Sequence, residues 1–197
     1  GAAPRPSAGP IGCSSMGNEE FYTRLRAQLI RDEGTGPMRE GRFFPYLDQL
    51  GKWTIGHGRN LSDVGISKEE AGILLSNDLF KTMLTVRERL PWIDQLSEPR
   101  QAVLYNMAFN MGVGSAEQGT GLLGFKKLLA ILSGQPYHAS QCATIVHPEH
   151  TPPCDCGAPA SRYYDAAHEM FYSKWADQVG MRAIRLMNQM ESGEWVD

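Results

Sequence analysis

A glycine-punctuated stretch between two helical regions constrains the fold of this chain most strongly. Upstream of it, apolar residues recur at every fourth position, at Phe21, Leu25 and Leu29. This spacing predicts an amphipathic helix that begins near Asn18, a good N-cap residue, and ends before Gly34. From residue 42 to 61 the pattern changes to aromatic and β-branched residues separated by glycines, which predicts short antiparallel strands. The chain therefore changes from helix to sheet soon after Gly34.

The rest of the chain is predicted to be mainly helical, which makes the expected fold class α+β. Ser67 and Glu70 form a capping box that opens a helix long enough to join a small β-hairpin lobe to a larger helical lobe. A second helix is expected from Ser97 to Gly112, with Pro99 in its first turn. Further helices are predicted at 122–132, at 164–172 and around 179–190.

Two segments differ in composition from this pattern. Residues 1–16 are rich in Gly, Ala, Pro and Ser, as in a flexible tail or linker, so the folded domain is expected to cover 17–197. Residues 135–162 form a Cys/His/Pro-rich insert loop. Its candidate ligands are Cys142, His147, His150, Cys154 and Cys156. Three interpretations stay open: a structural zinc site, a disulfide within the insert, or a loop with inert thiols.

The charge and hydropathy of the sequence argue against two classes of binding partner, nucleic acids and membranes. The formal net charge is −3 and the sequence has no long Lys/Arg run, which argues against nucleic acid and against an anionic membrane surface. No apolar stretch has the length of a membrane span, and no signal peptide is visible at the N-terminus. A leader removed earlier remains compatible with this pattern. We expect a monomer that neither binds nucleic acid nor inserts into a membrane.

Three side chains around the change from helix to sheet have the chemistry that cleavage of a glycosidic bond requires. One carboxyl group must protonate the leaving oxygen, and a second group must handle water or positive charge on the opposite face of the sugar. Glu33 is predicted at the carbonyl end of its helix, where the helix dipole disfavours ionisation and suits an acid. Asp48 follows in the hairpin, and Thr54 lies six residues further on, across a glycine turn. Such spacing lets the Thr54 hydroxyl lie beside Asp48.

Several short motifs accompany these residues. They are Asp-Glu-Gly at 32–34, Tyr-Leu-Asp at 46–48, Gly-Lys-Trp-Thr-Ile-Gly at 51–56, Phe-Asn-Met-Gly at 109–112 and Ser-Lys-Trp-Ala-Asp-Gln-Val-Gly at 173–180. Their order resembles glycoside hydrolase family 24, the phage-type lysozymes or endolysins. The resemblance covers roughly residues 18–197 apart from the insert. It implies a small β-lobe and a larger α-lobe joined by a long helix, with a cleft between the lobes.

The resemblance also implies roles for individual residues. Glu33 matches the general acid, Asp48 the second carboxylate and Thr54 the threonine that positions water. The matching substrate-side positions are Asn106 and Asn110, which look into the cleft, and Arg182, which lies near the acid.

The sequence departs from the family pattern in two places. The segment from Thr35 to Phe44 lengthens the loop between the two carboxyl groups, and His57 and Arg59 stand where other members have different residues. We place His57 with the substrate-binding residues and expect it to act as a structural donor rather than as a catalyst. Trp53 and Trp175 are interpreted as packing aromatics rather than as sugar platforms.

The function implied is hydrolysis of the β-1,4 bond between N-acetylmuramic acid and N-acetylglucosamine in bacterial peptidoglycan, with inversion and without a cofactor. Two alternatives stay open: a lytic transglycosylase that uses Glu33 alone, and a non-catalytic wall-binding or virion structural module. An endolysin would wait in the host cytoplasm before it reaches the wall, whereas a virion lysozyme or a secreted toxin would not. The sequence does not distinguish these settings.

Overall fold

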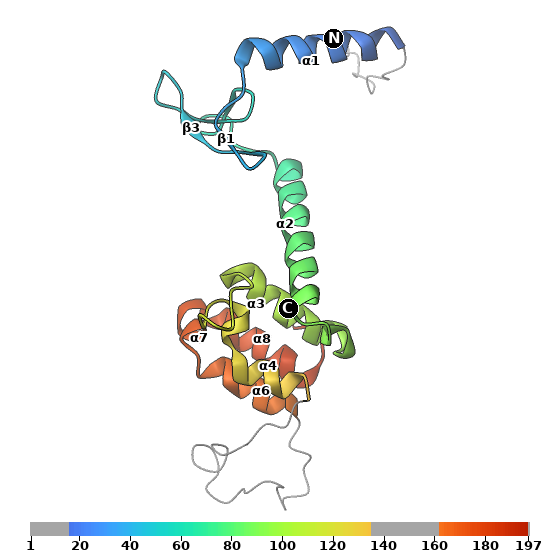
Figure 1. Cartoon of the computed structure of the whole chain (residues 1–197), viewed down its shortest axis with the longest axis vertical. Coiled ribbons are helices and arrows are strands. Elements are labelled where there is room, and N and C mark those ends of the chain that lie inside the picture. Colours follow the sequence, from blue (N-terminus) through green and yellow to red (C-terminus); the bar gives the residue numbers. More distant parts are fainter. Residues whose placement is uncertain (1–15, 135–161, 197) are drawn as a thin grey trace, which may run out of the picture. The chain divides into compact units, whose positions relative to one another are not determined.

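The computed structural model describes residues 16–134 and 162–196. The chain forms two compact units, Gly1–Ala71 and Gly72–Asp197, and each is described by itself below (Figure 1). The predictions of a flexible tail and of a zinc site or disulfide in the insert fall on 1–15 and 135–161, outside the described residues. The prediction of a mainly helical α+β fold is confirmed by the elements that follow.

The first unit begins with α1, Met16–Glu33, two residues earlier than the predicted Asn18. Gly34 ends the helix with a φ of +74°, a conformation that costs glycine little, so the predicted helix end is confirmed. A two-stranded hairpin follows, made of β1, Met38–Arg39, and β2, Arg42–Phe43. Both residues of its turn, Glu40 and Gly41, have positive φ, as a tight two-residue hairpin requires.

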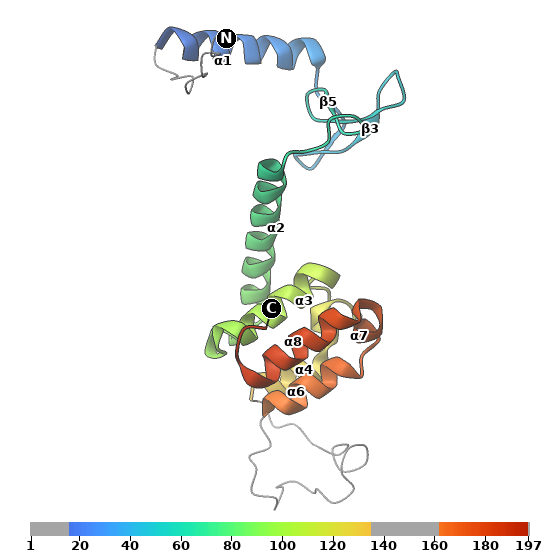
Figure 2. The same cartoon turned by 180° about the vertical axis from the view of Figure 1, so that it is seen from behind.

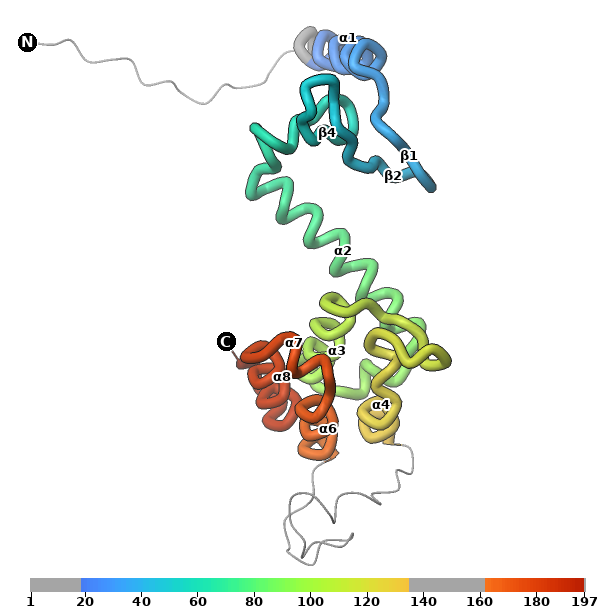
Figure 3. The backbone as a smooth tube through the Cα atoms, turned by 90° about the vertical axis from the view of Figure 1, so that its left-hand side faces the viewer, coloured from blue at the N-terminus to red at the C-terminus, as the bar shows by residue number. Residues whose placement is uncertain are grey.

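A second, three-stranded antiparallel sheet completes this unit, with strand order β3-β4-β5. Its strands are β3, Tyr46–Leu47, β4, Trp53–Ile55, and β5, Arg59–Asn60. Tyr46 pairs with Thr54 and Leu47 with Trp53. Figure 3 shows that the β1–β2 hairpin extends away from the segment that contains β4.

The helix α2, Lys68–Arg89, leads from the first unit into the second. The predicted capping box opens it: the Ser67 amide donates to Glu70 Oε2 at 2.6 Å, and the Glu70 amide donates to Ser67 Oγ at 3.1 Å. Apolar side chains along α1 and the first turns of α2 stay exposed, and Val86 of α2 is fully buried. Within 16–134 and 162–196, no helix is long and apolar enough to cross a membrane.

The second unit is a cluster of short helices. In chain order these are η1, Ile93–Gln95, α3, Glu98–Met111, η2, Leu122–Gly124, α4, Lys126–Leu132, α6, Arg162–Phe171, α7, Lys174–Val179, and α8, Met181–Ser192. Figure 2 shows α8 running alongside α6, and α4 packs against α6 as well.

Two of the predicted helices differ from the observed elements. The predicted helix 122–132 is two elements, because Phe125 between them, with φ −81° and ψ +57°, leaves the helical conformation. The last predicted helix, around 179–190, begins at Met181 as α8, because Gly180, with a φ of +55°, separates it from α7, a short helix that the sequence does not predict. The predicted end of the last helix is confirmed, since Gly193 adopts the left-handed conformation there.

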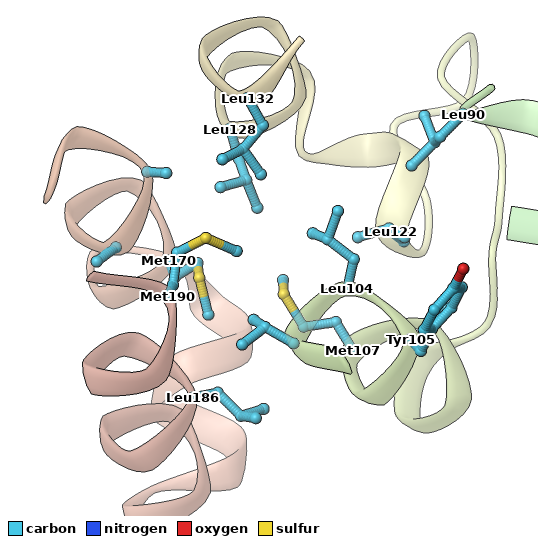
Figure 4. Close-up of a cluster of buried hydrophobic side chains, with 14 of the residues drawn as sticks. Leu90, Leu104, Tyr105, Met107, Leu122, Leu128, Leu132, Met170, Leu186 and Met190 are labelled. Carbon is cyan, nitrogen blue, oxygen red and sulfur yellow. The ribbon is translucent and has the colours of Figure 1, made fainter. Parts of the chain in front are cut away.

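An apolar core lies between the helices of the second unit. Figure 4 shows Leu128 and Leu132 from α4 facing Met170 from α6 and Met190 from α8, with Leu104 and Met107 of α3 beside them. These six side chains are at most 2% exposed. Tyr105 lies at one edge, and burial raises the pKa of its hydroxyl above the ordinary value.

Candidate active site

Glu33, the predicted acid, is the last residue of α1, and its carboxyl group lies over a glycine of the turn between β4 and β5. A Cβ atom added to Gly58 would meet Glu33 Oε2 at 3.1 Å. Gly58 also has a φ of +81°, so a side chain is disfavoured there both by backbone conformation and by space. The turn between β4 and β5 therefore has room for the glutamate because it carries no side chain at this position.

Two hydrogen bonds join the chain that leaves α1 to the same turn. The Gly36 amide donates to the Gly56 carbonyl at 2.9 Å. His57 Nδ1 lies 3.1 Å from the Gly34 carbonyl, and since a carbonyl only accepts, Nδ1 carries the proton. A Cβ atom at Gly36 would come within 2.7 Å of the Tyr46 ring, so this segment passes directly against β3.

Asp48 follows β3, and the backbone of its own turn orients its carboxylate. Oδ1 accepts from the Leu50 amide at 2.8 Å and from the Lys52 amide at 2.9 Å. These two bonds use one carboxylate oxygen and leave Oδ2 directed at Thr54, whose Oγ1 lies 3.5 Å away. The structure thus brings Asp48 and Thr54 together, as their spacing predicts.

Thr54 lies in the middle of β4 and is 4% exposed, the only buried side chain described in the first unit. Its hydroxyl also approaches the Lys52 carbonyl at 3.3 Å. Trp53 points to the opposite face of the strand, beside Leu47, because successive side chains of a strand alternate. Trp53 is 51% exposed, so it is not a core residue, and its packing against the other lobe stays a prediction.

The remaining predicted site residues belong to the second unit. Arg182 of α8 donates from Nε and Nη2 to Asn106 Oδ1 of α3, at 2.9 and 2.6 Å. Trp175 Nε1 donates to Asn110 Oδ1 at 3.0 Å, and the Trp175 ring is buried, as predicted for a packing aromatic. A direct pairing of Arg182 with Glu33 would join residues of different units and stays a prediction.

A cavity of about 420 Å³ lies in the second unit beside Trp175. Its wall includes the aromatic side chains Phe125 and Tyr172, and the charged side chains Lys126, Lys127, Glu169 and Lys174. The mixture of aromatic surface and amino groups suits a ligand that has both apolar parts and carboxylates. In 16–134 and 162–196, no group of three or more His, Cys, Asp or Glu side chains is arranged to hold a metal ion.

With this geometry in place, the comparison with known proteins is decisive. Residues 38–135 match the profile of a family described as phage lysozyme. The chain belongs to the phage lysozyme family. An SAR-endolysin of Enterobacteria phage P21 is 30% identical to it over 83 residues, which are 40% of this chain and 48% of that protein. The chain thus matches about half the length of this curated relative.

The family match covers the sheet and most of the predicted site. Asp48, Thr54, His57, Asn106 and Asn110 fall within residues 38–135, whereas Glu33 and Arg182 fall outside. The family assignment therefore depends on the strands and the central helices. The position of Glu33 depends on the local geometry at the end of α1.

Sequence reasoning missed some of the contacts that build the site. It interpreted Gly56 and Gly58 as tight-turn residues, and both do have positive φ, but Gly58 in addition makes room for Glu33. Arg59 donates to Glu70 Oε2 at 2.7 Å and so ties β5 to the start of α2.

Proposed function

We propose that this protein is an N-acetylmuramidase that hydrolyses the β-1,4 bond between N-acetylmuramic acid and N-acetylglucosamine in peptidoglycan, with inversion. Glu33 protonates the leaving oxygen as the general acid. Asp48 and Thr54 hold the water that attacks the opposite face of the sugar. Membership of the phage lysozyme family supports a cell-wall lytic enzyme, and the choice of bond and of stereochemistry is our proposal.

The observation that carries the proposal is the arrangement of Asp48 and Thr54. Backbone amides saturate Asp48 Oδ1, and Oδ2 faces a buried hydroxyl at 3.5 Å. This separation is long for a direct hydrogen bond, and a water that bonds to both oxygens fits such a pair well. Because Asp48 is anchored by its own turn, its free oxygen can accept a proton from water without reorientation.

Glu33 suits the complementary role. Its carboxyl group is exposed, so it can reach a substrate oxygen, and Gly58 places no side chain in its way. The acid stands at the end of a helix and the water site in the sheet, so different elements hold the two functions, as attack on opposite faces of one sugar requires.

The second unit supplies groups for the substrate. Asn106 and Asn110 use their side-chain oxygens within the protein, whereas no described hydrogen bond uses their amide nitrogens. These nitrogens are donors for sugar hydroxyl or acetamido oxygens. Lys126 and Lys174 at the cavity suit the carboxylates of the peptide stems that peptidoglycan carries.

Turnover of purified sacculi by Glu33→Gln tests the proposal. The amide keeps the shape of the side chain but gives up no proton, so the turnover number should fall by about 10³-fold or more, with the fold unchanged. Asp32→Asn is the matched control, because Asp32 is the neighbouring exposed acid on α1, and its activity should stay near wild type. Lysis by folded Glu33→Gln at the wild-type rate would reject the assignment.

Product analysis separates the related reactions. Proton NMR of the first products from a defined oligosaccharide should show the α anomer, since inversion of a β linkage produces it. A β anomer would indicate retention, and a 1,6-anhydro end would indicate a lytic transglycosylase. The name of the phage P21 relative, an endolysin, supports action on the wall of the host at release.

A further inference from the structure

His57 makes two contacts that link the end of α1 and the β1–β2 hairpin to the turn between β4 and β5. Its Nδ1 donates to the Gly34 carbonyl at 3.1 Å. Its ring packs edge-on against Phe43 of β2, with the ring centroids 5.2 Å apart and an interplanar angle of 70°. The bonded carbonyl belongs to the residue directly after Glu33, the proposed acid.

The surroundings of Glu33 leave few other restraints on this segment. The carbonyls at the end of a helix lack intrahelical partners, and Gly34 and Gly36 carry no side chain that could hold the chain by packing. Besides the His57 bond, one backbone bond, from Gly36 to Gly56, joins the segment to the turn. Loss of the His57 hydrogen bond therefore removes a restraint on Gly34, the residue that directly follows Glu33.

We infer that His57 is a positioning residue: it acts on Glu33 through the Gly34 carbonyl and fixes where the acid meets the leaving oxygen. The inference rests on the proposed function and adds a residue to it. An inverting hydrolase needs two carboxyl groups and no imidazole, so this histidine needs no chemical role of its own. The Nδ1 proton of His57 is donated to the Gly34 carbonyl. Both the neutral Nδ1–H tautomer and the imidazolium cation can make this hydrogen bond.

The kinetic constants distinguish a positioning residue from a residue that contacts substrate. A positioning residue acts in the transition state, where the acid must lie within hydrogen-bond reach of the leaving oxygen, so its loss lowers kcat and leaves KM unchanged. A substrate-contacting residue acts on binding, so its loss raises KM.

Two variants of equal size isolate the hydrogen bond. In His57→Asn, the amide nitrogen takes the place of Nδ1, three bonds from Cα, and keeps a donor for Gly34. In His57→Leu the shape is the same and the donor is gone. Assayed as full-length proteins on sacculi, His57→Leu should lose about tenfold in kcat with KM unchanged, and His57→Asn should stay within about twofold of wild type. Phe44→Leu is a control, because Phe44 neighbours Phe43 but stacks under Arg39 instead.

Binding to sacculi in the inactive Glu33→Gln background supplies the second measurement. Both His57 variants should bind as tightly as Glu33→Gln alone. Equal kcat for wild type and folded His57→Leu would overturn the inference, and so would an equal loss in the Asn and Leu variants or a weakened binding to sacculi. Each of these outcomes is distinct from failure of the proposed function, which shows as activity of Glu33→Gln itself.

Discussion

Different interactions stabilise the interior of each of the two units. In the second unit, side chains from α2 onward form one apolar core that is largely sealed from solvent. In the first unit, as far as residues 19–71 are described, Thr54 is the only buried side chain. There, backbone hydrogen bonds, glycine turns and polar side chains such as Asp48 and His57 set the geometry.

This difference predicts which substitutions should change turnover and which should change the free energy of unfolding. A core residue contributes to stability through the large apolar area that it removes from water. A polar contact in an exposed sheet contributes little to stability but fixes the position of a reacting group. Substitutions in the first unit should therefore change turnover, whereas substitutions in the second should change the free energy of unfolding.

The largest expected effect on stability is at Leu104. This side chain is fully buried in α3, and Leu104→Ala should lower the free energy of unfolding by about 2–5 kcal/mol, through lost burial and the cavity left behind. Leu47→Ala makes the same change on β3 of the first unit, where the side chain is 57% exposed, and should cost under about 1 kcal/mol. Urea unfolding followed by circular dichroism measures both. Equal losses would break the distinction between the two units.

At Thr54 we expect a large effect on kcat and a small effect on the free energy of unfolding. Thr54→Val keeps the shape of the side chain and removes the hydroxyl that faces Asp48, so kcat should fall by about 10²-fold, because the water loses one of its two holders. The free energy of unfolding should change by only about 1 kcal/mol. Thr54→Ser restores the hydroxyl and should recover most of the activity. A valine variant as active as wild type would remove Thr54 from the mechanism.

Arg182 tests a polar contact within the unit that has the apolar core. Arg182→Ala removes both hydrogen bonds to Asn106 Oδ1 between α8 and α3, so thermal or urea unfolding should show a loss of about 1–2 kcal/mol. If Arg182 also pairs with Glu33, as the resemblance implies, the acidic limb of the pH–rate profile should shift as well. Stability lost without a change in that profile would make Arg182 a structural residue of the second unit only.

The smallest effect should come from Asp165 on α6. Burial raises the pKa of its carboxyl group, and the nearby His168 partly opposes that rise. A folded-state pKa above the unfolded value means that the protonated form contributes stability at low pH, and that this contribution disappears as pH rises through the folded pKa. Asp165→Asn should therefore stabilise the protein at pH 7 by under about 1 kcal/mol, and by nothing near pH 3. Destabilisation at pH 7 would show that the carboxylate has a stabilising partner.

Much of the fold follows from local sequence signals. The capping box at Ser67 and Glu70, the helix end at Gly34 and the helix from Glu98 to Met111 are all where the sequence predicts them. Each depends on a few neighbouring residues, so tertiary structure has little to add. The errors lie at Phe125 and Gly180, because a helix-compatible pattern does not reveal which residue leaves the helical conformation.

For the site, the sequence by itself supplied the candidate side chains and determined that Thr54 and Asp48 lie close together, since both belong to one hairpin. Only the tertiary structure decided that Gly58 makes room for Glu33, that His57 donates to Gly34, and that Thr54 rather than Trp53 lies on the buried face of β4. The first two contacts join residues more than twenty positions apart in sequence, and the third depends on strand register. Spacing along the chain specifies a local turn, whereas contacts between distant segments depend on how the backbone folds back on itself.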